Sequence, residues 1–434
     1  MAALFYAHKA IGVVPPCYFI ESTAPNNIDD GPTPLLDLKK AQLEGVLEYV
    51  EADQAVSEIA KHLADAQAPN LVVMVHGFNN PELAALKLYK TAAQAAAADP
   101  AISTRKGLVC IGYRWPSEKM PQPWNTARQA LPPFPVRILW GGALVVLVSL
   151  IAYVWFNSWL WHIPVILGLA LMGLVAVAML LRCIVYFRDG YRAVNYGVPD
   201  LIEIIRQIDA SVLGLSSSPR RNWIELSFIG HSMGGFVVTN SIRALTDLFA
   251  PDGLRQSLNT GTIRSVEGPI EKVSSGIGHV FTLKRFVLAS PDIPAETLLS
   301  NRANFLEPAL RRFEEAYLFS NEGDEVLRLI STTANYFSFP TRSWTYGYRL
   351  GNVEILSSGY GLIDPRQEGF LRSLRIGVNT LHKLYKKLRD SEIPPGGAVV
   401  ADKGKSSYQE KLPKVFTYFD CTDYVDASGD GKPA

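Results

Sequence analysis

The spacing of apolar and polar residues along the chain predicts strands and helices in alternation. Continuous apolar runs of strand length, typical of strands buried on both faces of a sheet, occur at 71–75, 108–113, 223–229, 281–289, 315–320 and 414–420. Apolar residues at helical spacing occur at 36–63, 81–98, 188–209, 235–249 and 370–389. Near the start, 11–14 and 17–20 predict one or two edge strands. This alternation indicates an α/β fold, with a mostly parallel sheet covered by helices on both faces.

One segment departs from this pattern. Between Arg137 and Arg182 the chain has 44 residues without an Asp, Glu, Lys or Arg. It divides into 138–156 and 163–181, each about 28 Å long as a helix at ~1.5 Å per residue, which matches the roughly 30 Å hydrocarbon core of a bilayer. Tryptophans cluster towards the ends of these runs, as in an aromatic belt. We therefore expect a transmembrane hairpin with its turn at 157–162; a buried hairpin in a soluble core and a hydrophobic lid are the alternatives.

The hairpin falls between a predicted strand and the helix that follows it, so it interrupts a single domain. The expected organisation is a first part of that domain at 1–137, the hairpin at 138–181 and a second part at 182–434. Arginines flank both ends of the hairpin while its turn has none, and the positive-inside rule then places the globular part in the cytoplasm. The first 16 residues carry His8 and Lys9 and do not resemble a secretory signal.

Charge and cysteine content narrow the functions to consider. The formal net charge is +1, which gives no electrostatic basis for binding nucleic acid. The four cysteines lie far apart, at Cys17, Cys110, Cys183 and Cys421. They have neither the spacing of a metal site nor that of a disulfide framework, which fits a reducing compartment. We expect no metal ion and no cofactor.

The most specific motif lies at 230–234, which reads Gly-His-Ser-Met-Gly. A strand-like run precedes it and a predicted helix follows, and this is the context of a nucleophile elbow. Ser232 would sit at a strained turn, so Gly230 and Gly234 must be small for strand and helix to approach each other. Such a turn places the hydroxyl at a helix N-terminus, where the positive dipole favours developing negative charge. The alternative is a chance occurrence of the pattern in an ordinary turn.

The strand at 71–75 leads into His-Gly-Phe-Asn-Asn at 76–80, which has the form of an oxyanion loop. Gly77 permits close approach of the backbone. The amide of Phe78 is then one expected oxyanion donor, and the amide of Met233, directly after the nucleophile, is the second. The alternative is an ordinary strand-to-helix turn. Arg-Trp-Pro-Ser at 114–117 shapes either the rim of a site or a structural turn.

Together with Ser-Pro-Asp at 290–292 and the segment 320–324, these motifs resemble the α/β-hydrolase superfamily, most of all a bacterial branch of uncharacterised function. The likeness covers roughly residues 65–130 and 185–335. It implies a serine hydrolase with the chain order nucleophile, acid, histidine. It also implies that the hairpin lies in a bacterial inner membrane.

The resemblance implies a catalytic acid after the strand 315–320, at Asp324, with Asp292 as the reserve candidate. Of the seven histidines only His382 follows Asp324. It lies inside the predicted helix 370–389, whereas the family places its base in the loop after the last strand. The base is therefore His382 in an unusual setting, or lies beyond Ala434, or is absent.

Two other histidines lie near the predicted site in the sequence. His231 precedes the serine, but the elbow directs neighbouring side chains elsewhere, so we assign it no role. His76 is expected to support the oxyanion loop.

The favoured hypothesis is hydrolysis of an ester or related acyl compound, small or lipid-like, by Ser232 acting without a cofactor. The alternative is a catalytically silent fold that serves as a membrane-anchored scaffold or interaction protein, which the missing histidine favours. A transporter or channel subunit is disfavoured because the two spans hold no charged residue.

Overall fold

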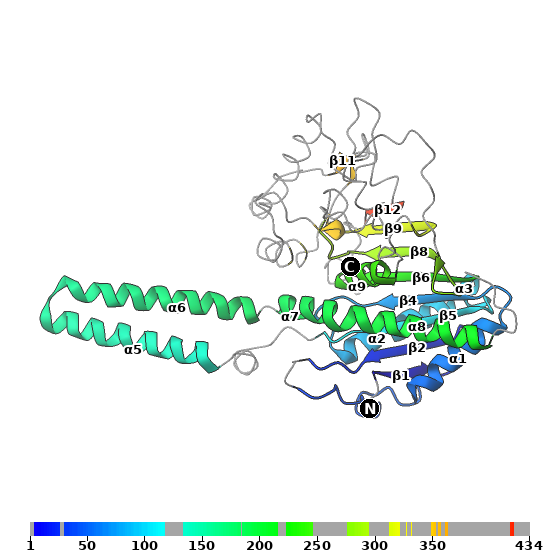
Figure 1. The fold of residues 1–434 in the computed structure, drawn as a ribbon, viewed down its shortest axis with the longest axis horizontal. Helices are drawn as coiled ribbons and strands as arrows, with labels where there is room; N and C mark the ends of the chain where they lie inside the picture. Colours follow the sequence, from blue (N-terminus) through cyan, green and yellow to red (C-terminus); the bar gives the residue numbers. More distant parts are fainter. Residues whose placement is uncertain are drawn as a thin grey trace. The chain divides into compact units, whose positions relative to one another are not determined.

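The computed structural model consists of two compact units (Figure 1). It describes residues 4–26, 30–117, 133–183, 185–215, 223–245, 276–294, 312–321, 327, 331, 349–352, 355–356, 361–362 and 417–420. One unit comprises Met1–Ser117 and Arg192–Ala434, and the other comprises Glu118–Tyr191. The inserted unit extends beyond the 138–181 expected from hydropathy at both ends.

The first unit is built on one sheet, which has ten strands within the described residues. They are β1 (Phe5–Ala10), β2 (Cys17–Ser22), β3 (Leu47–Val50), β4 (Asn70–Val75), β5 (Leu108–Arg114), β6 (Ile224–His231), β7 (Gly276–Ile277), β8 (Phe281–Ala289), β9 (Glu315–Ser320) and β12 (Thr417–Asp420). The order across the sheet is β12, β9, β8, β6, β4, β5, β2, β1, β3, with β7 beside β8. A separate pair joins β10 (Ile355–Leu356) to β11 (Gly361–Leu362).

The strands from β12 to β2 are all parallel to their neighbours. In contrast, β1 is antiparallel to both β2 and β3, and β7 is antiparallel to β8. The predicted mostly parallel sheet is therefore confirmed, with the antiparallel strands β1 and β3 at one edge and β7 beside β8.

Helices cover both faces of this sheet (Figure 1). On one face lie α1 (Ala52–Asp65), α8 (Val198–Leu215) and α9 (Met233–Leu245); on the other lies α2 (Glu82–Ala98), followed by the short α3 (Pro100–Ser103). Two neighbours in β2 show the division, because successive side chains of a strand point to opposite faces. The Tyr18 hydroxyl donates to Glu58 of α1 at 2.9 Å, while the Phe19 ring stacks on Tyr89 of α2 with centroids 6.0 Å apart.

Two predicted helices differ from the structure. The helix expected at 36–63 begins only at Ala52, because 47–50 forms β3 and pairs with β1. Gly45 has a φ of 78°, a left-handed conformation that is incompatible with a continuous helix through this segment. The helix expected at 188–209 is three consecutive helices: α7 (Val185–Arg192), the π-helix η2 (Ala193–Gly197) and α8. The helix predicted at 370–389 lies outside the described residues.

The predictions for the first strands were wrong in placement. The segment 11–14 forms a turn, with Gly12 at a φ of 69°, and the strand is β1, which ends at Ala10. The segment 17–20 belongs to β2, which lies between β1 and β5 rather than at an edge. Local spacing does not indicate which strands become neighbours, and this explains the error.

The second unit contains a helical hairpin of α5 (Pro133–Phe156), the 3-10 helix η1 (Trp159–Trp161) and α6 (His162–Cys183). Two glycines let the helices pack closely. A Cβ on Gly142 would lie 2.7 Å from Cγ of Met172, and one on Gly168 would lie 2.8 Å from a methyl carbon of Val146. The two runs predicted at 138–156 and 163–181 fall within α5 and α6, so their helical conformation is confirmed.

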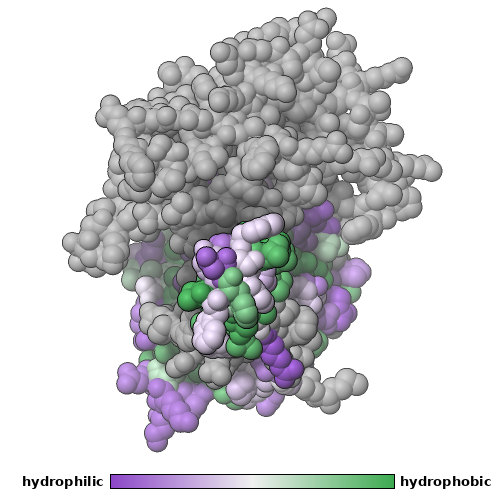
Figure 2. All heavy atoms as spheres, turned by 90° about the vertical axis from the view of Figure 1, so that its left-hand side faces the viewer, coloured by the Kyte–Doolittle hydropathy of each residue, from purple (hydrophilic) through white to green (hydrophobic). Residues whose placement is uncertain are grey.

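The hairpin exposes large apolar side chains on both helices and at the turn. Their exposed fractions reach 76% for Val154, 82% for Trp155 and 64% for Leu167. Figure 2 views the hairpin end-on and shows hydrophobic residues interspersed with more polar ones. Among the described residues, no helix is both long and apolar enough to cross a membrane.

A buried group of charges lies where β2 and β5 end. Glu21 and Arg114 are register partners, and their side chains form an ion pair that is 2% and 3% exposed. Burial raises the pKa of Glu21 to about 7; Arg114 opposes this shift, while the half-buried carboxyl of Glu82 in α2 adds to it. Burial also raises the pKa of Glu82. Two carboxyls therefore share one guanidinium within the core.

We expect the free energy of unfolding to fall as pH rises from about 4.5 to about 7, the ordinary and the folded pKa of Glu21. The reason is that the folded state holds this proton more tightly than the unfolded chain does. Glu82→Gln removes the competing carboxyl and leaves the Glu21–Arg114 ion pair, so the fall should become smaller by roughly 1 kcal/mol or more. Denaturant unfolding of both chains at about pH 5 and about pH 8 measures the difference.

Glu58→Gln is the matched control. Hydrogen bonding from Lys9 lowers the pKa of Glu58, so this carboxyl titrates below the pH window and its removal should leave the pH dependence within the window unchanged. Equal pH dependence in the wild type and Glu82→Gln would contradict the coupling of the two carboxyls.

Candidate functional site

Ser232 occupies the turn between β6 and α9. Its φ of 50° lies in the left-handed region, which residues other than glycine rarely adopt. Its amide donates to the carbonyl of Ala289 at 2.9 Å, and its carbonyl accepts from the amides of Asp292 at 3.0 Å and Gly235 at 3.1 Å. Hydrogen bonds from β8 and the residues after it thus hold the serine in a conformation that a free turn would not favour. The predicted sequence of strand, turn and helix is confirmed.

The glycines of this turn have no room for a side chain. A Cβ on Gly230 would lie 2.5 Å from Cα of Gly235. One on Gly234 would lie 2.2 Å from the carbonyl oxygen of Val75 and 2.6 Å from that of His76. These atoms belong to the backbone and cannot rotate away. The strand β6, the helix α9 and the end of β4 therefore meet at contact distance, as expected of an elbow.

The loop that follows β4 lies directly against the serine. A Cβ on Gly77 would come 2.6 Å from Cβ of Ser232, and Val75 is the register partner of Gly230. Phe78 is buried, as is Met233, the first residue of α9. The structure thus brings together the two segments whose amides were predicted to hold an oxyanion.

His76 is buried beneath this loop. Its Nδ1 lies 2.6 Å from the carbonyl oxygen of Gly77 and its Nε2 lies 3.2 Å from that of Trp115. Its ring stacks on the Trp115 indole, whose Nε1 donates to the His76 carbonyl at 3.0 Å. Burial lowers the pKa of His76 to about 3, so the ring is neutral near pH 7 and donates through one nitrogen only. The contacts support the expected role of His76 in holding the loop, and the fully buried Trp115 packs with it.

Asp292 is buried on the other side of the serine. Its Oδ1 lies 3.0 Å from Nε of Arg349, an ion pair whose angle is not that of a hydrogen bond. Its Oδ2 accepts from the hydroxyl of Ser331 at 3.1 Å, and Arg349 also donates to the Ser331 carbonyl at 3.0 Å. Because the Asp292 amide donates to the Ser232 carbonyl, these contacts fix the segment that holds the turn. They favour a positioning role for this residue, our reserve candidate for the acid.

His231 is a residue that the sequence analysis set aside. It is exposed, and its Nδ1 is 3.0 Å from the point that a Cβ on Gly77 would occupy. Its ring therefore lies over the loop that touches Ser232. The pairing of Val75 with Gly230 is the feature that places it there, and strand pairing is not visible in the sequence.

The other two predicted catalytic residues, Asp324 and His382, lie outside the described residues. Asp324 follows β9 by four positions, and β9 is the parallel neighbour of β8. The carboxyl ends of β6, β8 and β9 lie along one edge of the sheet. The order of the strands is therefore compatible with an acid after β9.

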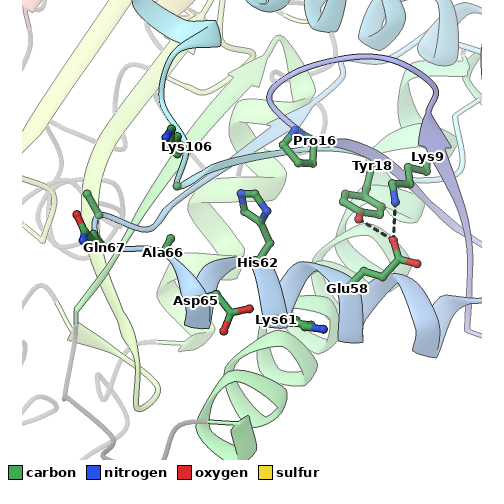
Figure 3. A pocket seen from close by; sticks show the side chains of 12 residues that line it. Lys9, Pro16, Tyr18, Glu58, Lys61, His62, Asp65, Ala66, Gln67 and Lys106 are labelled. Atoms are coloured by element: carbon green, nitrogen blue, oxygen red, sulfur yellow. Dashed lines mark hydrogen bonds and ion pairs between the residues drawn. The ribbon is translucent and has the colours of Figure 1, made fainter.

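A cavity of about 860 Å³ lies at the opposite edge (Figure 3). Pro16, Ala68 and Gly107, which line it, precede β2, β4 and β5, so it opens at the amino ends of these strands. Within it Glu58 pairs with Lys9 at 2.7 Å. Ligands of open parallel sheets bind at the carboxyl ends of the strands, where Ser232 lies, so we do not assign the site to this cavity.

Comparison of the sequence and the structure with known proteins identified no similar protein. No family model, curated protein or solved structure matches the chain. Within the described residues there is also no cluster of three or more His, Cys, Asp or Glu side chains that could hold a metal ion.

Gly234→Ala should destabilise the first unit by roughly 3 kcal/mol or more, because the added carbon meets two carbonyl oxygens of the backbone. Gly214→Ala is the control: it lies in α8 with nothing within 4 Å of the added carbon, and we expect a gain of about 0.5–1 kcal/mol. Denaturant unfolding compares the two. A neutral Gly234→Ala would mean that β4 and α9 do not approach as closely as described.

Proposed function

We propose that this protein is a serine hydrolase that cleaves an ester or related acyl bond through Ser232. The observation that carries the proposal is the conformation of Ser232, whose backbone has a left-handed φ. The residue lies between a parallel strand and the N-terminus of a helix, and the glycines around it have no room for a side chain. Strain of this kind persists only where surrounding structure enforces it, and it clusters at active sites. The sheet order around β4, β5 and β6 supports membership of the α/β-hydrolase superfamily.

In the proposed reaction the Ser232 hydroxyl attacks the acyl carbon as a base takes its proton, and water later releases the acyl group. The amides of Phe78 and Met233 stabilise the oxyanion, helped by the N-terminus of α9. Contact between Gly77 and Ser232 supports this arrangement. Such a reaction needs no cofactor.

The base and the acid belong to the same proposal. Asp324 is the favoured acid because Asp292 is engaged by Arg349 and Ser331. His382 is the candidate base from chain order. His231 becomes a second candidate, since its ring lies over Gly77.

A fluorophosphonate probe tests the nucleophile, because it modifies only an activated serine. We expect labelling of the full chain and of Ser57→Ala, an exposed serine of α1, but none of Ser232→Ala. Loss of the true base should slow labelling and p-nitrophenyl ester hydrolysis by roughly 10²–10⁴-fold, so His382→Ala and His231→Ala identify it. An unlabelled but folded wild-type chain would overturn the proposal in favour of a silent scaffold.

We further propose that the α5–α6 hairpin anchors the hydrolase in a bacterial inner membrane. Support comes from the exposed apolar side chains around both helices, since a helix that is apolar all round belongs in a core or in lipid. The close packing at Gly142 and Gly168 is also typical of helix pairs in membranes. Arg137 and Arg192 flank the hairpin and favour a cytoplasmic catalytic unit. A lipid-like substrate would fit this location.

Cysteine accessibility tests the membrane topology. In a chain whose four cysteines are replaced by serine, Ser158→Cys should react with an impermeant maleimide in spheroplasts, because it lies in the turn between α5 and η1. Ser57→Cys, on α1, should react only after the membrane is opened. Reaction of Ser57→Cys in intact spheroplasts would reverse the orientation, and recovery of the whole protein in the soluble fraction would exclude the anchor.

A further inference from the structure

Two cysteines face each other across neighbouring strands of the sheet. Cys17 in β2 and Cys110 in β5 are register partners in a parallel pair, so their side chains project from the same face. That face packs against α2, where Cys17 joins a cluster with Phe19, Leu86 and Tyr89 and Cys110 packs against it. The two thiols are close enough for each to shift the pKa of the other. Both are free.

The two thiols are not equivalent. Cys17 is buried, whereas Cys110 is only partly buried, so an oxidant reaches Cys110 more readily. The Cys17 sulfur lies 3.2 Å from the carbonyl oxygen of Pro15 and can donate its proton there or to Cys110. Contact with Cys110 and burial both raise the pKa of Cys17, while the hydrogen bond from Cys17 lowers the pKa of Cys110. The thiolate, which is the nucleophile in thiol oxidation, therefore forms on the more accessible cysteine.

Strand spacing permits a covalent bond between them. Neighbouring strands lie about 4.7–4.9 Å apart, and the Cα atoms of a disulfide lie about 4.4–6.8 Å apart. Facing residues of a parallel pair come near the short end of this range, so the bond requires only a small local adjustment. A bond formed with some strain is more easily reduced, which suits a reversible reaction in a reducing compartment.

We propose that Cys17 and Cys110 form an oxidant-responsive dithiol that a hydroperoxide converts into a disulfide between β2 and β5. The Cys110 thiolate attacks the terminal peroxide oxygen, giving a sulfenic acid and releasing an alcohol, or water from hydrogen peroxide. The Cys17 thiol then attacks the sulfenic sulfur, forming the disulfide and releasing water. Two thiols are oxidised and one peroxide bond is reduced; a dithiol reductant then restores both thiols by disulfide exchange and is itself oxidised.

The test uses the full-length protein in detergent, with Cys183→Ser and Cys421→Ser so that only this pair remains. Treatment with hydrogen peroxide should remove the mass of two hydrogen atoms from the intact chain and block both thiols against maleimide after unfolding. Dithiothreitol should restore both. Labelling of Ser232 by a fluorophosphonate is measured in parallel, and the outcome for the dithiol does not depend on it.

Single variants test the assigned roles. Adding Cys17→Ser removes the second step, so a sulfenic acid should accumulate at Cys110 and be trapped by dimedone. Adding Cys110→Ser should leave Cys17 unmodified at the same peroxide dose. Retention of both free thiols in the folded, peroxide-treated protein would overturn the proposal, provided that the same dose oxidises the unfolded chain. Dimedone trapping at Cys17 in the Cys110→Ser variant would overturn the proposed order of attack.

Discussion

Contact between the β6–α9 turn and the end of β4 is the constraint on which the candidate site depends. Gly234 meets the carbonyl oxygens of Val75 and His76 at distances that exclude any side chain. That contact places the N-terminus of α9 beside the loop after β4, and so places Gly77 against Ser232. Without it the loop after β4 would not be held against Ser232, and the strained φ would depend on the hydrogen bonds with Ala289 and Asp292 alone.

The surroundings of the turn enforce the same geometry from the other side. Ser232 is hydrogen-bonded to Ala289 and Asp292, and Asp292 is in turn held by Arg349 and Ser331. A buried charge without its partner is costly, so these residues favour one arrangement of the segment after β8. Rigid support on both sides of a strained residue is what the proposed role of Ser232 as a nucleophile requires.

The β2–β5 strand pair carries two pairs of facing polar residues within the hydrophobic core. Cys17 faces Cys110, and four residues further along the same strands Glu21 faces Arg114. Beyond Arg114 the chain continues to Trp115, which stacks on His76 beneath the loop at Ser232. This strand pair is thus connected through packed side chains to the candidate site. The hairpin differs from this strand pair, because many of its large apolar side chains are exposed rather than buried.

The sequence by itself determined the main elements and the turn at Ser232. Continuous apolar runs located β4, β5, β6, β8 and β9, and Gly-x-Ser-x-Gly located the bend at Ser232, because both signals are local in the chain. Tertiary structure alone decided which strands are neighbours. It moved β2 into the sheet, paired β3 with β1 and brought Cys17 against Cys110. It also paired Asp292 with Arg349 in an ion pair and placed the His231 ring against Gly77. These contacts join residues that are far apart in the sequence. Which residues meet depends on the order of the strands in the sheet, and the local spacing of residues does not encode that order.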